Sequence, residues 1–324
     1  MTVSALVPCR IWPSDDRVRL LDVSGVDLVE PFFGDTIRRL VVEQGRQPVD
    51  ESLSAWDPEG PELAGSIFHV GRCGSTLLSN MVQATSGRCV VREPPAGNDL
   101  TSALVTATAY AVDPSEGWRR LVAAFGAATG GPAVVKHSSW EALFAPDLVR
   151  AMRAPVVALV REPTEVVSSL VDQPPSWVRD LWLPPDRLAI HYPGVLEAAG
   201  SPPRTAVDWY LALWMATADA LLSLDAESVL VVTYRDLIRD PVEVLAQVLT
   251  LLGVRVPHRR SIAERIEPLR SAYSKASPRD QSVPYEPMGS HARPRLRRQT
   301  VQQIRERTDP RWRELLQRSN QDRR

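Results

Sequence analysis

Two glycines, an arginine and a hydroxyl pair follow an apolar run in the segment HVGRCGSTLL. The run Ile67–Val70 ends at Gly71, and a short turn leads into a helical pattern. A helix that begins directly after a strand directs backbone N–H groups and the positive end of its dipole at an anion. Gly71 and Gly74 let the backbone approach a ligand closely, and Arg72 adds a forked cation suited to phosphate or sulfate oxygens. The segment therefore predicts an anion-binding loop.

The same loop lacks the lysine that binds a nucleoside triphosphate. Loops that bind nucleoside triphosphates follow the pattern G-x-x-x-x-G-K-[ST]. If Gly71 is the first glycine of this pattern, the second should stand at position 76, where this sequence has Thr76. Cys73 raises the question of a thiolate activated at a helix N-terminus. A phosphatase-like loop would have an arginine six residues after the cysteine, where Ser79 stands. We therefore interpret Cys73 as an uncharged packing residue without a chemical role. An ordinary strand-to-helix turn remains the alternative for this stretch alone.

Two further segments place polar residues at the ends of apolar runs. The run Val156–Val160 ends at Arg161, and Ser169 follows about two helical turns later. Ligands of open parallel sheets bind at the carboxyl ends of the strands, which indicates a binding role for Arg161, with a surface ion pair to Glu162 or Glu165 as the alternative. After the run Val229–Thr233 comes Tyr-Arg-Asp-Leu, beginning at Tyr234, which alone predicts nothing.

Apolar runs alternate with helical patterns from residue 65 onward. This alternation predicts an α/β domain over 65–324, a P-loop-like three-layer sandwich with a central parallel sheet flanked by helices. Residues 1–64, with one helix near Pro31–Glu43, are predicted to be an N-terminal extension packed on the core. The predicted strands are Ile67–Val70, Arg88–Val91, Ala133–Lys136, Val156–Val160 and Val229–Thr233, and the predicted helices are Thr76–Ala84, Asn98–Ala111, Ser115–Thr129, Trp140–Met152, Pro163–Leu170, Ala206–Asp225 and Pro241–Leu252.

Two long segments interrupt this alternation. The first, 172–203, is rich in proline and contains Trp177 and Trp182, and the second, 270–294, is polar and also contains prolines. Loops of this length in a compact domain are usually functional or disordered. The tryptophans indicate a wall or lid for a substrate, with a purely structural insertion as the alternative.

Composition and charge exclude several classes of protein. The 324 residues, 44% of them hydrophobic, suffice for one large domain or two small ones with a hydrophobic core. The net charge of −1 gives no indication of nucleic-acid binding. No signal-peptide pattern or membrane-spanning apolar run appears, and the three scattered cysteines fit neither a disulfide framework nor a zinc site. We expect a cytoplasmic protein without nucleic-acid or membrane partners.

Together, the three motifs resemble those of the sulfotransferase superfamily. Its members move a sulfuryl group from 3′-phosphoadenosine-5′-phosphosulfate (PAPS) to an acceptor and release the bisphosphate PAP. The resemblance covers roughly Ser66 to Pro294. An arginine at the start of the loop is similar to the tyrosylprotein branch. Cys73 stands where serine is common, and Arg235 replaces the usual acid.

The resemblance implies which residues hold the donor. The 5′-phosphosulfate is implied to lie in the loop, and the 3′-phosphate at Arg161 and Ser169, or Ser168 if the register differs by one. Tyr234 is implied to lie near the adenosine, and Lys275, in 270–294, to reach the 3′-phosphate as that segment closes over the cofactor. No metal is expected. The implied cofactor-binding residues are Arg72, Cys73, Gly74, Ser75, Thr76, Arg161, Ser169, Tyr234 and Lys275.

Transfer to a hydroxyl needs a group that accepts its proton and cations that stabilise the leaving phosphate. Glu93 follows the second predicted strand, at the spacing from Arg72 that the tyrosylprotein branch has for its catalytic glutamate. His137 follows Lys136 and stands one position earlier than the histidine of the cytosolic branch, and a one-residue shift on a strand reverses the face. We therefore favour Glu93 over His137 as the base. Arg72, with Lys136, is expected to stabilise the leaving group.

Two other functions stay open at this point. An ATP-dependent small-molecule kinase shares the strand-loop-helix, but the sequence lacks Gly-Lys and has Arg161 where a metal-binding aspartate is expected. A non-catalytic homologue that binds PAP would accommodate the substitutions at Cys73 and Arg235. For an enzyme, missing targeting signals favour a hydroxylated small molecule, as in secondary metabolism, as the acceptor. The identity of the acceptor and the oligomeric state are not predicted.

Overall fold

A parallel five-stranded sheet forms the centre of the protein. The computed structural model describes residues 5–105, 110–174, 194–200, 203–271 and 298–321, together with Tyr192 and Leu296. The strands lie in the order β5-β6-β4-β7-β8, and each neighbouring pair is parallel. Their bounds are β4 (Gly65–His69), β5 (Val90–Arg92), β6 (Val134–Lys136), β7 (Val156–Val160) and β8 (Val229–Thr233). This arrangement confirms the predicted α/β class with a central parallel sheet.

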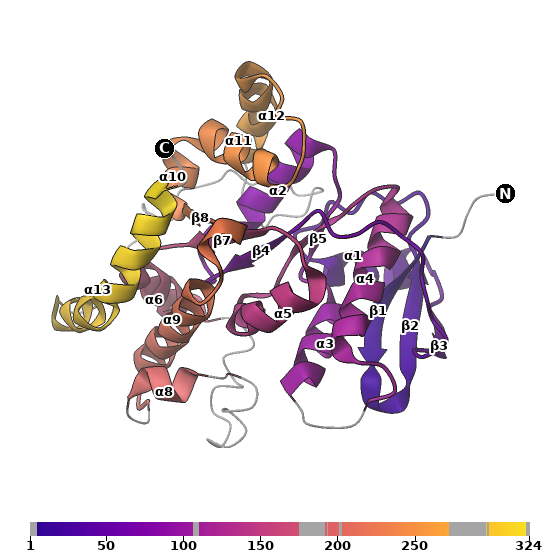
Figure 1. Ribbon diagram of the computed structural model, residues 1–324, viewed down its shortest axis with the longest axis horizontal. Helices are drawn as coiled ribbons and strands as arrows, with labels where there is room; N and C mark the ends of the chain where they lie inside the picture. The colour runs from indigo at the N-terminus through magenta and orange to yellow at the C-terminus, as the bar shows by residue number, and fades with distance from the viewer. Residues whose placement is uncertain are drawn as a thin grey trace.

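Helices cover both faces of this sheet (Figure 1). Helices α2, α11 and α12 lie on one side of it, and α5 and α9 lie on the other. The helices are α1 (Phe33–Arg38), α2 (Ser75–Ser86), α3 (Pro95–Val105), α4 (Pro114–Thr129), α5 (Ala145–Met152), α6 (Pro163–Asp172), α8 (Val195–Ala199), α9 (Ala206–Leu222), α10 (Tyr234–Arg239), α11 (Pro241–Leu251), α12 (Arg259–Ser271) and α13 (Arg298–Gln321). No helix in the described part of the chain is both long and apolar enough to cross a membrane.

The strands of this sheet are buried along their whole length. Every residue of β4, β7 and β8 is buried, as expected for parallel strands covered on both faces. Helices α6 and α11 each begin with a carboxylate cap and a proline in the first turn. Glu162 accepts the Glu165 N–H at the start of α6, and Asp240 accepts the Glu243 N–H at the start of α11.

The N-terminal region contains a second sheet that the sequence analysis did not predict. Strands β1 (Leu6–Trp12), β2 (Arg17–Asp22) and β3 (Val49–Ser52) form an antiparallel sheet that packs against α3 and α4 (Figure 1). The β1–β2 register shifts between Pro8 and Arg10, so the apolar alternation along β1 is broken. The helix expected near Pro31–Glu43 is present as α1 and a π-helical continuation to Glu43.

Several boundaries differ from those predicted. The helix predicted over Trp140–Met152 is a 3₁₀ helix, Ser139–Phe144, followed by α5, because Pro146 is accommodated only in the first turn of a new helix. The charged helices α12 and α13 lack a broad apolar stripe and were not predicted. Most of 172–203 and of 270–294, including Trp177, Trp182 and Lys275, lies outside the described residues.

Candidate functional site

The loop between β4 and α2 has an unusual backbone. Gly71, Arg72 and Gly74 all have positive φ, at 76°, 48° and 86°. This region is open to glycine but costs a side-chain-bearing residue such as Arg72 about 1–2 kcal/mol. The turn starts α2 directly behind the end of β4, with Gly74 as its N-cap. The α2 N-terminus therefore faces the carboxyl edge of the sheet, where an anion site is expected.

Arg161 joins the three motifs. One guanidinium nitrogen, Nη1, donates to the carbonyl oxygen of Arg72 at 2.9 Å, and the guanidinium lies 4.3 Å from the centre of the Tyr234 ring. The Tyr234 ring packs on Gly74, where an added Cβ would come within 2.9 Å of it. The indole of Trp214 donates to the Arg161 carbonyl at 3.1 Å. The structure thus brings together the loop, the end of β7 and the start of α10.

Arg72 and Ser169 both lie near the end of α6. Arg72 Nη2 donates to the carbonyl of Gln173, the C-cap of this helix, at 2.5 Å. The hydroxyl oxygen of Ser169 is buried and has no hydrogen-bond partner among the described residues. A buried hydroxyl without a partner costs free energy unless a further group binds it. Together with the close packing at Gly74, this oxygen fits a polar ligand held between the loop and α6.

A carboxylate and an ammonium group meet at the ends of β5 and β6. Lys136 Nζ forms an ion pair with Glu93 Oε1, and the Lys136 side chain is only 1% exposed, against 22% for Glu93. Glu93 has φ 50°, and its N–H donates to the Lys136 carbonyl at 2.7 Å. His69 Nε2 lies 3.9 Å from the same Glu93 oxygen. His69 was not predicted as a site residue, although a polar residue that ends an apolar strand before the loop is a signal in the sequence.

His137 points into the core instead. Its side chain is fully buried and its ring stacks on Phe68, with centroids 4.2 Å apart. Its Nε2 lies 3.3 Å from the hydroxyl of Ser66, and its Nδ1 lies 3.6 Å from a carboxylate oxygen of the fully buried Glu141. The side chain therefore lies away from Glu93, as a one-residue shift at a strand end implies. The choice between Glu93 and His137 as base stays a prediction.

Arg92, next to Glu93, has a different role. Its guanidinium donates to the Ser79 hydroxyl, the Gln83 side chain and the carbonyl of Leu28. Burial lowers the pKa of Arg92 to about 10, so the group stays charged at neutral pH. Arg92 thus holds α2 and the N-terminal region together. Glu93 is not among these partners of Arg92, and its carboxylate pairs with Lys136.

Cys73 is expected to resist alkylation in the folded protein. Its side chain is fully buried, and burial raises the pKa of the thiol to about 12. The reactive thiolate therefore forms only as the pH approaches that value, and at pH 8 nearly every Cys73 is protonated. Mass spectrometry after iodoacetamide treatment should find Cys73 unmodified in folded protein and modified after denaturation. Rapid labelling of folded protein at pH 8 would instead indicate an activated thiol.

Gly74→Ala is expected to weaken both folding and ligand binding. Gly87→Ala is the matched control, since Gly87 also has positive φ (68°) but nothing lies within 4 Å of its added Cβ. Each substitution should lower the free energy of unfolding by about 1–2 kcal/mol through backbone strain. Gly74→Ala should lower it further by displacing Tyr234, and it alone should weaken nucleotide binding. Urea denaturation and calorimetry measure both effects; equal losses in the two variants would contradict the close packing.

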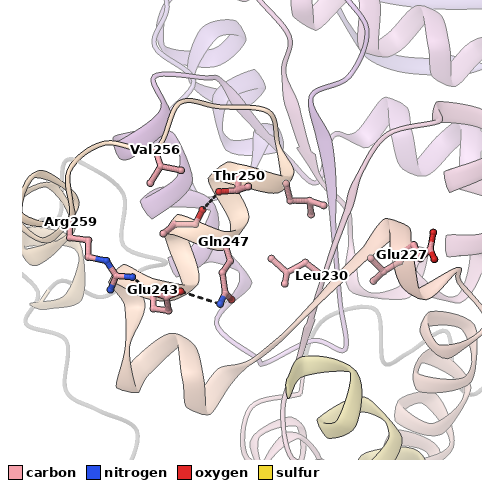
Figure 2. Close-up of a pocket in the computed structure, with 10 residues that line it drawn as sticks. Glu227, Leu230, Glu243, Gln247, Thr250, Val256 and Arg259 are labelled. Atoms are coloured by element: carbon pink, nitrogen blue, oxygen red, sulfur yellow. Dashed lines mark hydrogen bonds and ion pairs between the residues drawn. The ribbon is translucent and has the colours of Figure 1, made fainter. Parts of the chain in front are cut away.

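A cavity of about 500 Å³ lies elsewhere, between the first residues of β8 and helix α11 (Figure 2). Figure 2 shows Leu230, Gln247 and Val256 around it, with Arg259 paired to Glu243 at its rim. No predicted site residue lines this cavity. It opens at the amino end of β8, whereas ligands of parallel sheets bind at the carboxyl ends.

No cluster of three or more His, Cys, Asp or Glu that could hold a metal ion occurs in the part of the chain that the structure describes. Cationic groups at the carboxyl edge of the sheet come instead from Arg72, Lys136 and Arg161. All three have a partner within the protein, and Arg161 Nε also donates to a carboxylate oxygen of Glu165 at 2.7 Å, which is the ion pair that the sequence left open as the alternative for Arg161. A ligand phosphate would therefore have to compete for these three cations with the carbonyl and carboxylate oxygens of the protein that the cations now contact.

Among known proteins, matches to this chain were found only among solved structures. No protein-family model and no curated protein matches the chain. The sulfotransferase domain from the curacin biosynthetic pathway is 14% identical, with a TM-score of 0.43 over 78% of this chain and 99% of that one. The sulfotransferase domain from the Synechococcus PCC 7002 olefin synthase is 17% identical, with a TM-score of 0.44 over 77% and 95%. Mouse sulfotransferase SULT7A1 complexed with PAP is 13% identical, with a TM-score of 0.43 over 81% and 87%.

At these identities and TM-scores the likeness assigns no function by itself. These three solved structures are sulfotransferases.

Proposed function

We propose that the protein is a sulfotransferase that uses PAPS to sulfate a hydroxyl of a small molecule. One observation supports this most: Arg161 contacts the carbonyl of Arg72 and stacks on Tyr234, which packs on Gly74. Three separate motifs thus form one cationic site at the carboxyl edge of the sheet. A loop with an early arginine and no Gly-Lys fits a terminal phosphosulfate better than a triphosphate with Mg²⁺.

The residues present fit the two ends of such a nucleotide. Arg72, with the hydroxyls and backbone of Ser75 and Thr76 at the start of α2, would hold the 5′ end. Arg161 would hold the 3′-phosphate, with the buried hydroxyl of Ser169, which has no other partner among the described residues. Tyr234 offers its ring near the adenosine. Lys275, outside the described residues, remains a further candidate for the 3′-phosphate.

When bound, PAPS supplies an activated sulfuryl group and PAP as its leaving group. Glu93 would accept the proton of the acceptor hydroxyl, for which its partly exposed carboxylate is suited. Accepting that proton removes the charge that now pairs with Lys136. Lys136 would then be free to stabilise negative charge on nearby phosphate oxygens, together with Arg72. Hydroxylated small molecules in the cytoplasm, including those of secondary metabolism, are the acceptors that we propose.

A comparison of nucleotides by thermal shift tests this function. Adenosine 3′,5′-bisphosphate at one hundred times its Kd should stabilise the protein by about 2.7 kcal/mol. Adenosine 5′-monophosphate, which lacks the 3′-phosphate, should stabilise it much less at the same concentration. ATP with Mg²⁺ should have little effect. Stabilisation by ATP with Mg²⁺ alone would instead favour a kinase and contradict the proposal.

A further inference from the structure

His69 has contacts that fix which of its ring nitrogens carries a proton. Nδ1 lies 3.1 Å from the backbone nitrogen of Gly71, and Nε2 lies 3.0 Å from the carbonyl oxygen of His137. The Gly71 N–H can only donate, so Nδ1 must accept; the His137 carbonyl can only accept, so Nε2 must donate. These partners together select the neutral imidazole protonated at Nε2.

The ring also lies at a junction of the proposed site. His69 ends β4, and its side chain, 5% exposed, spans from the start of the anion loop to the end of β6. The backbone pairing between β4 and β6 extends to Ile67 and Lys136. The His69 ring therefore bridges these two strands just beyond their last paired residues. Its Nε2 also faces the Glu93 carboxylate at 3.9 Å.

We infer that His69 is a positioning residue of the site: it holds the anion loop through the Gly71 N–H and ties that loop to the end of β6, next to the Glu93–Lys136 pair. This inference rests on the proposed function for its effect on nucleotide binding. The physical reason is that Arg72, directly after Gly71, has positive φ, a conformation that a residue other than glycine keeps only where surrounding contacts impose it. The His69–Gly71 hydrogen bond is such a contact, at the first residue of the turn.

Two substitutions separate the two contacts of the ring. Asn places its side-chain oxygen near the position of Nδ1, whereas Gln places its amide nitrogen near the position of Nε2. His69→Asn should therefore keep an acceptor for the Gly71 N–H and lose the donor to the His137 carbonyl. His69→Gln should do the reverse, and His69→Ala should lose both contacts.

The tautomer can be measured on the protein without ligand. The chain has five histidines, so ¹⁵N-histidine labelling gives few imidazole signals, and the signals missing in His69→Asn identify His69. At neutral pH, Nδ1 of His69 should have the shift of an unprotonated ring nitrogen, and Nε2 that of a protonated one. A proton on Nδ1 would overturn the inference, because Nδ1 then cannot accept from Gly71.

The variants test the consequence for the loop. Hydrogen exchange of a peptide covering 70–76 should be faster in His69→Ala and His69→Gln than in wild type, and close to wild type in His69→Asn. Affinity for adenosine 3′,5′-bisphosphate should fall about tenfold in His69→Ala and His69→Gln, the cost of one lost hydrogen bond, but about twofold or less in His69→Asn. His69→Asn should instead lower the melting temperature by about 2–4 °C through the unpaired His137 carbonyl.

The outcomes distinguish this inference from the proposed function. Equal exchange in all three variants and wild type would overturn the positioning role, whether or not the nucleotide binds. If wild-type protein fails to bind adenosine 3′,5′-bisphosphate, the proposed function fails, while the ¹⁵N shifts and the exchange rates still decide whether His69 holds the loop. If wild type binds and all three variants bind equally well, the inference fails and the proposed function stands.

Discussion

Glu93→Gln is expected to lower kcat by about two to four orders of magnitude, the usual contribution of a positioned proton acceptor. The amide cannot take the proton of the acceptor hydroxyl, yet it keeps an oxygen that can accept from Lys136 and nearly the same volume. Affinity for adenosine 3′,5′-bisphosphate should therefore stay near that of wild type. Turnover is measured with ³⁵S-labelled PAPS and the hydroxylated compound that wild type sulfates fastest in a panel of simple phenols and alcohols.

Two further variants test whether the loss of turnover is specific to the Glu93 carboxylate. Glu59→Gln removes a carboxylate from an exposed residue that is not among the described site residues, and its turnover should equal that of wild type. His137→Ala opens a cavity beside Phe68 and should lower stability, but the turnover of its folded fraction should stay within about one order of magnitude of wild type, well below the loss expected of a general base. Full turnover by Glu93→Gln, combined with loss of turnover in His137→Ala, would assign the base to His137.

Arg161→Ala is expected to weaken the binding of adenosine 3′,5′-bisphosphate about 30- to 150-fold. A charge-assisted hydrogen bond contributes about 2–3 kcal/mol at a desolvated site, and the Arg161 side chain is only 8% exposed. The substitution also removes the contact to the Arg72 carbonyl, so the loop loses a partner as well. Isothermal titration calorimetry measures the affinity directly.

The controls for Arg161 separate charge from geometry. Arg150→Ala removes an exposed arginine of α5 and should leave the affinity unchanged. Arg161→Lys keeps a positive charge but loses the planar fork that contacts Arg72 and stacks on Tyr234, so we expect a partial loss. If Arg161→Ala binds adenosine 3′,5′-bisphosphate as tightly as wild type, the 3′-phosphate does not lie at Arg161.

The parallel sheet was predictable because its strands are buried on both faces. Val156–Val160 and Val229–Thr233 are continuous apolar runs, and their predicted bounds match β7 and β8. The N-terminal sheet was not predictable by the same signal. Its strand β3 is exposed at all four residues, Val49–Ser52, so its pairing with β2 leaves no hydrophobic pattern in the sequence.

The candidate site was predictable in its members but not in its contacts. Short motifs indicated Arg72, Arg161 and Tyr234, since their residue types and strand-end positions suit an anion. The bond from Arg161 to a carbonyl of the loop depends on the order of β4 and β7 in the sheet, which the sequence does not specify. The same holds for the contacts of His69, which join chain segments far apart in sequence.

A structure of the protein with adenosine 3′,5′-bisphosphate bound would show directly where the two phosphates lie. We expect the 5′-phosphate at the N-terminus of α2, in contact with Arg72 and the hydroxyls of Ser75 or Thr76. The 3′-phosphate should contact Arg161 and the buried Ser169 hydroxyl. A nucleotide bound elsewhere, such as in the cavity of Figure 2, or with its phosphates away from the loop and Arg161, would contradict the account.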